Sequence, residues 1–201
     1  MTREDQADYF AVFGLPRQLA LDVEALQRRF YELSRRHHPD FHQGASAAAQ
    51  GEALATSALV NRAYRALRDP LVRVEYLVAL EGGAPAGERG GGKPRPPMDL
   101  LEEMLEVQEG LMEARAAGLG ADERARLAES RRQLVERYQG EEAAIIGRFP
   151  EWDRAAERDR PALVAWFKER LAARAYLRTV IDDLAEALGE DTETHVAHRR
   201  H

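Results

Sequence analysis

Apolar residues recur at three- and four-residue spacing through most of this chain, and this periodicity is the feature that most constrains its fold. One such stretch follows Asp22, another runs from about Ser46 to Arg68, and a third covers Pro161–Leu188. This spacing places apolar residues on one face of an α-helix, whereas a half-buried strand needs strict alternation. No alternating run of useful length is present, so the sequence predicts an all-α fold.

Capping residues and prolines set the expected ends of the helices. Asp22 is a good N-cap, Pro39 ends the helix that follows it, and the pair Asp69-Pro70 ends one helix and begins the next. The other expected helices are Tyr9–Phe13, Asp99–Ala117, Asp122–Phe149 and Pro161–Leu188. In the helix over 46–68, the side chains expected to face inward are Leu54, Leu59, Ala63, Tyr64 and Leu67.

A run of glycine and proline divides the chain. Residues 82–97 read GGAPAGERGGGKPRPP, a composition typical of a linker. We therefore expect a first domain over 1–81, a linker over 82–97 and a second domain over 98–189. Three amphipathic helices with short connections make the second domain a three-helix bundle. The polar residues 190–201 are expected to form a disordered tail.

Composition excludes several classes of protein. The 201 residues include no cysteine, so this chain alone holds no disulfide, Cys-ligated zinc or iron–sulfur cluster. The net charge of -6 comes from the second half of the chain, which argues against nucleic-acid binding as the main function. No apolar run is long enough to span a bilayer and no signal peptide is seen, so we expect a cytoplasmic protein with no membrane contact. A monomer is expected.

The stretch SRRHHPDFHQG at 34–44 allows three interpretations: a metal site, an acid–base site, or a loop that contacts another protein. A metal site lacks a second group of ligands, and an acid–base site lacks a nucleophile and a pocket. We therefore predict no metal, no cofactor and no enzymatic activity, and favour the contact loop. An electrostatic strip for an acidic partner is expected on the preceding helix, formed by Arg28, Arg29, Arg35 and Arg36.

Three motifs together resemble the J-domain of the DnaJ co-chaperone family. The tripeptide His38-Pro39-Asp40 follows an arginine-rich helix, DYFAVFGLP (8–16) resembles the first J-domain helix, and NRAYRALRDPLVRVEYLVALEG (61–82) closes the unit. The first and last motifs are more similar to HscB, the dedicated J-protein of bacterial iron–sulfur cluster assembly. The layout of a J-domain, a short linker and a helical second domain agrees with HscB.

The resemblance implies two protein partners. The J-domain would bind an HscA/DnaK-type chaperone and stimulate its ATP hydrolysis through His38, Pro39 and Asp40. The second domain would bind the scaffold protein IscU and deliver it. The scaffold-binding residues implied by the resemblance are Leu101, Leu105, Glu106, Glu109 and Tyr176. Two alternatives stay open: a different client on the second domain, and a core position for both leucines and the tyrosine.

Overall fold

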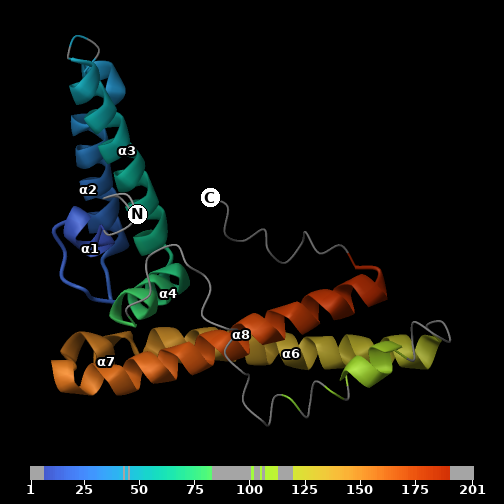
Figure 1. Cartoon of the computed structure of the whole chain (residues 1–201). Coiled ribbons are helices and arrows are strands. Elements are labelled where there is room, and N and C mark those ends of the chain that lie inside the picture. The colour runs from blue at the N-terminus through green and yellow to red at the C-terminus, as the bar shows by residue number, and fades with distance from the viewer. Residues whose placement is uncertain are drawn as a thin grey trace. The chain divides into compact units, whose positions relative to one another are not determined.

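The computed structural model describes residues 7–42, 44, 46–82, 101, 105, 107–112 and 120–190. These residues form helices and turns without a strand, which confirms the predicted all-α fold (Figure 1). Positions 101, 105 and 107–112 are also helical. The expected linker beyond Gly82, the tail beyond Glu190 and the predicted site residue Glu106 lie outside the described residues. The helices are α1 (Tyr9–Val12), α2 (Val23–Arg36), α3 (Ala47–Arg68), α4 (Pro70–Glu81), α6 (Ala121–Gly147), α7 (Phe149–Arg154) and α8 (Arg160–Leu188).

The helices begin where the capping residues predicted. Asp22 accepts hydrogen bonds from the backbone N–H groups of Glu24 and Ala25 at the start of α2. Ser46 caps α3, and Asp69 caps α4, which has proline in its first turn. Each cap satisfies N–H groups that have no partner within the helix, so the start of each helix is fixed locally.

The chain folds into two compact units, which do not follow simple boundaries along the sequence. The first unit contains Met1–Gly91 and Ile146–Phe167, and the second contains Gly92–Ile145 and Lys168–His201. A segment from late in the chain thus belongs to the same unit as the N-terminal helices. The second domain expected from the sequence, 98–189, included residues 146–167, which belong to the first unit.

The first unit is built on a hairpin of α2 and α3 with α1 and α4 at its base (Figure 1). Phe30 of α2 stacks on Tyr64 of α3, with ring centroids 4.1 Å apart. Phe10, Leu67 and Leu77 of this unit are fully buried. The prediction for Leu54 was wrong, because this side chain is 62% exposed while its neighbour Ala53 occupies the buried stripe.

Helix α7 is packed into the core of the first unit. The Trp152 indole is fully buried, and its Nε1–H donates to the carbonyl oxygen of Arg17 at 3.0 Å. The Asp153 carboxylate accepts the backbone N–H groups of Leu19 at 2.6 Å and Ala20 at 2.9 Å. These contacts hold the segment between α1 and α2 against α7.

Arg73 of α4 is a buried cation in the same core. One of its guanidinium nitrogens donates to the carbonyl oxygen of Leu67 at 2.7 Å, and the guanidinium lies 5.7 Å from the centre of the Phe149 ring. Burial lowers the pKa of Arg73, while the charges of Asp153 and Asp69 favour its protonated form. The positive charge of the buried Arg73 is therefore stabilised in part by Asp153 and Phe149 of α7.

The Tyr76 hydroxyl joins α4 to α1 by hydrogen bonds, and its ionisation makes the stability of the first unit depend on pH in the alkaline range. It accepts the Tyr9 backbone N–H at 2.9 Å and donates to the carbonyl oxygen of Ala7 at 3.3 Å. Burial raises the pKa of Tyr76, because the phenolate form loses hydration inside the protein. The folded protein therefore holds this proton more tightly than the unfolded chain. The resulting stability is present below the ordinary tyrosine pKa of about 10 and is lost as pH rises through the raised value.

Tyr76→Phe is expected to lower the free energy of unfolding at pH 8 by about 1–2 kcal/mol, because the Tyr9 N–H loses its acceptor. The difference between the wild type and the variant should shrink above about pH 10, where the wild type loses the contribution of the protonated hydroxyl. Urea unfolding followed by circular dichroism at several pH values measures both effects. Parallel pH profiles for the two proteins would contradict this account of Tyr76.

The second unit has its own apolar core, formed where α6 packs against α8. Leu134, Leu177 and Leu184 are almost completely buried. The carboxylates of Glu141 and Glu142 pair with Arg170 at 3.2 Å and Arg174 at 2.9 Å at the edge of this core. The residues that complete the buried cluster are Val107, Leu111, Leu127, Ala173, Val180, Ile181 and Leu188.

Candidate functional site

The His-Pro-Asp loop, residues 37–42, lies at the end of α2 in the first unit. Helix α2 ends at Arg36, where the His37 backbone N–H donates to the carbonyl oxygen of Leu33 at 3.0 Å. A 3₁₀ turn then covers Pro39–His42. The side chains of His38 and Asp40 are 52% and 71% exposed. The loop therefore presents a polar pair to solvent at the end of a rigid helix.

His38 and Asp40 also contact each other. The Asp40 backbone N–H donates to Nδ1 of His38 at 3.3 Å, and the same nitrogen lies 3.5 Å from the Asp40 Oδ2 atom. A neutral imidazole that accepts at Nδ1 carries its proton on Nε2. The loop thus offers an imidazole N–H donor and a carboxylate acceptor from positions on either side of Pro39.

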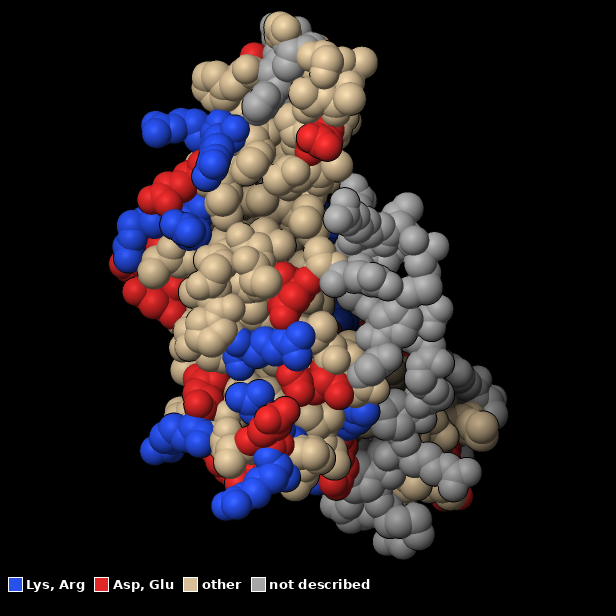
Figure 2. All heavy atoms as spheres, turned by 60° about the vertical axis from the view of Figure 1, so that its left-hand side comes forward, with Lys and Arg blue, Asp and Glu red and all other residues tan. Residues whose placement is uncertain are grey.

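The arginine strip (Arg28, Arg29, Arg35 and Arg36) is exposed on α2 as predicted. Arg28 lies 3.7 Å from a Glu24 carboxylate oxygen, and Arg29 lies 3.5 Å from one of Glu32. Figure 2 shows Lys and Arg side chains along one edge of the hairpin with Asp and Glu among them. The strip is therefore partly neutralised by its own helix. The spacing of three and four residues between these pairs was a sequence signal for this neutralisation.

The predicted scaffold-binding residues fall in the second unit and differ in burial. Leu105 is 60% exposed, Glu109 is exposed, and Leu101 is partly buried. Tyr176 of α8 is partly buried and packs against the apolar core. The core-facing positions near Leu105 are instead filled by Val107 and Leu111. The alternative interpretation, a position in the core of the bundle, thus agrees better with the partial burial of Tyr176 than with the exposure of Leu105.

Sequence reasoning missed Met112, which is 71% exposed and lies seven residues after Leu105. Residues separated by seven lie close to one face of a helix. Leu105, Glu109 and Met112 therefore share an exposed face, which we call the 105–112 face. Their spacing was visible in the sequence.

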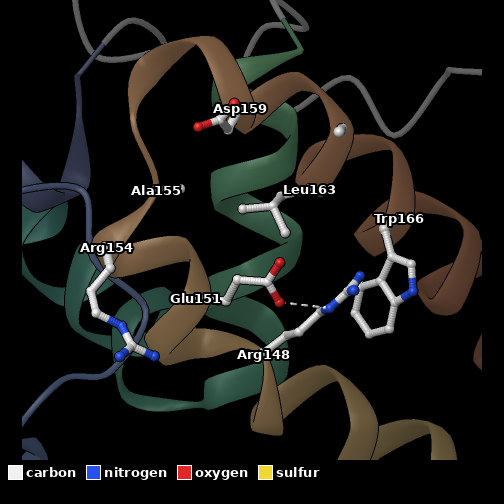
Figure 3. Close-up of a pocket in the computed structure, with 8 residues that line it drawn as sticks. Arg148, Glu151, Arg154, Ala155, Asp159, Leu163 and Trp166 are labelled. Atoms are coloured by element: carbon white, nitrogen blue, oxygen red, sulfur yellow. Dashed lines mark ion pairs between the residues drawn. The ribbon is translucent and has the colours of Figure 1, made fainter.

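A separate shallow cavity of about 600 Å³ lies between α7 and the start of α8 (Figure 3). Leu163 and Trp166 form its apolar wall, and Arg148 lies 4.3 Å from the centre of the Trp166 ring. Arg148 also pairs with Glu151 at 2.9 Å, as the dashed line in Figure 3 marks. Two of the charged side chains that line this cavity, Arg148 and Glu151, are thus paired with each other.

Within the part of the chain that the structure describes, no three His, Asp or Glu side chains gather as a metal site requires. None of the described helices combines the length and the hydropathy needed to cross a bilayer.

The chain is similar to proteins of known structure. No family model matches the chain. The solved structure of the chaperone HscB from Vibrio cholerae is 27% identical, with a TM-score of 0.57, and the match covers 90% of this chain and 99% of that one. The human co-chaperone HscB is 24% identical, with a TM-score of 0.60, over 90% of this chain and 82% of that one. The predicted resemblance to HscB-type J-domain co-chaperones is thereby confirmed, and it supports a co-chaperone role.

Proposed function

We propose that this chain is a co-chaperone that stimulates ATP hydrolysis by an HscA/DnaK-type chaperone and delivers the IscU-type iron–sulfur scaffold to it. The observation that carries the proposal is the exposed His38–Asp40 pair, held on a short turn at the end of α2. In this role the chain activates a partner ATPase and is not itself the enzyme. A cytoplasmic location and a monomeric state complete the proposal.

The side chains of the loop can make contacts that favour one conformation of a partner protein. The Asp40 carboxylate can accept a charge-assisted, bidentate pair from a partner arginine, and His38 can donate a hydrogen bond from Nε2. The fixed ring of Pro39 lowers the entropy lost when the loop is ordered on a partner. Stimulation follows if these contacts are stronger with the conformation of the ATPase that hydrolyses ATP.

The 105–112 face supports the delivery half of the proposal. Leu105 and Met112 supply exposed apolar area, and Glu109 supplies a charge between them. Exposed apolar side chains grouped with polar and charged ones are found at many protein-binding surfaces. We propose that Leu101 extends this surface, that Tyr176 supports it from α8, and that Glu106 also takes part in scaffold binding.

Leu105→Glu is expected to weaken binding of the IscU-type scaffold by about tenfold or more, because it places a charge in the apolar part of the interface. Stability should change by less than about 0.5 kcal/mol, since Leu105 is largely exposed. Calorimetric titration with the scaffold measures the affinity. The control is Leu54→Glu, which alters an equally exposed leucine of the first unit. Equal scaffold affinity in all three proteins would place the scaffold contact outside the 105–112 face, whereas no measurable binding by the wild type would favour a different client.

A further inference from the structure

Phe41 is the first residue after the His-Pro-Asp tripeptide, and its side chain is 71% exposed. A single exposed apolar residue is common on protein surfaces and needs no explanation by itself. Phe41 differs because two contacts join it to His38. Its backbone N–H donates to the carbonyl oxygen of His38 at 3.1 Å. Its ring also meets the His38 ring edge-on, with centroids 6.2 Å apart and planes at 73°.

The ring therefore belongs to the same small surface as the two polar groups of the loop. The turn holds Phe41 in place before any partner arrives, and an aromatic side chain loses little conformational entropy on binding. Buried aromatic anchors provide much of the affinity of protein interfaces. An aromatic ring beside a charge pair also excludes water, which strengthens the pair.

We propose that Phe41 is an apolar anchor of the contact with the chaperone ATPase, and that its ring enters an apolar recess next to the basic side chain that pairs with Asp40. The chaperone ATPase is the partner proposed for Phe41 because Phe41 is continuous with the His38–Asp40 surface through both its backbone and its ring. This inference rests on the proposed function and adds to it a residue that contributes affinity for the chaperone. Asp40 and His38 act on hydrolysis, whereas Phe41 contributes affinity.

The test is a titration of the HscA/DnaK-type chaperone with the 201-residue chain, with ATP turnover as the readout. Phe41→Ala is expected to raise the concentration needed for half-maximal stimulation by about tenfold or more, while the maximal rate stays within twofold. Phe41→Leu keeps apolar bulk and should stay within about threefold of the wild type. Leu54→Ala, which shortens an exposed leucine of α3, should leave both values unchanged.

Several results would overturn the inference. A half-maximal concentration for Phe41→Ala within twofold of the wild type would make Phe41 an ordinary surface residue. A lower maximal rate without a change in half-maximal concentration would place Phe41 in the hydrolysis step instead. A wild-type dimer that Phe41→Ala converts to a monomer would assign the ring to self-association. Failure of the wild type to stimulate the chaperone would remove the proposed function itself, and this inference with it.

Discussion

Asp40→Asn is expected to reduce ATP turnover by the chaperone to within about twofold of the rate without any J-protein. Asparagine has nearly the same shape, and its backbone N–H can still donate to Nδ1 of His38, so the turn should persist. The substitution removes the negative charge that a partner arginine would bind. Losing one partner of a charge pair that becomes buried at an interface costs about 2–5 kcal/mol.

The measurement is steady-state ATP turnover at a saturating concentration of the variant. Asp182→Asn is the matched control, since it removes one carboxylate from the surface of α8 and gives the same net charge. The control should stimulate as the wild type does. Stimulation by Asp40→Asn equal to that of the wild type would show that the loop does not act through this carboxylate. Circular dichroism spectra of the three proteins should coincide.

Trp152→Ala is expected to lower the free energy of unfolding of the first unit by about 3–5 kcal/mol. The side chain is fully buried, and its loss leaves a cavity against Phe167, whose ring centroid lies 6.5 Å away. The substitution also removes the hydrogen bond from Nε1 to the carbonyl oxygen of Arg17. The loss represents a large share of the stability of a domain of ordinary size.

Urea unfolding followed by circular dichroism measures this loss, and hydrogen exchange at the amides of α2 and α4 locates it in the first unit. The control is Trp166→Ala, because Trp166 is only partly buried at the margin of the cavity in Figure 3. The control should cost less than half as much as Trp152→Ala. A loss below about 1 kcal/mol for Trp152→Ala would contradict the structural role given to α7.

Local sequence signals were enough to predict most helices and their starts. Asp22, Ser46 and Asp69 act through N–H groups two or three residues away, so their effect can be read from the sequence. The tripeptide and its flanking motifs likewise predicted the resemblance to HscB. Leu54 shows the limit of this reasoning, because the buried stripe of α3 includes Ala53 instead.

The packing of α7 could not be predicted in the same way. Trp152 bonds to Arg17, and Asp153 to Leu19, across more than 130 residues of chain. No periodicity or cap within a short window carries such information, since it depends on how the helices are brought together. The position of Met112 is a different case, because its spacing from Leu105 was available and was not used.

The most direct test of the central claim is single-turnover ATP hydrolysis by an HscA/DnaK-type chaperone, measured alone, with this protein, and with this protein plus the IscU-type scaffold. The account predicts faster hydrolysis on addition of the protein and a further increase when the scaffold is present. An increase without any scaffold effect would keep the J-domain role and assign the second unit to another client. A hydrolysis rate that the wild-type protein leaves unchanged, with and without scaffold, would contradict the account.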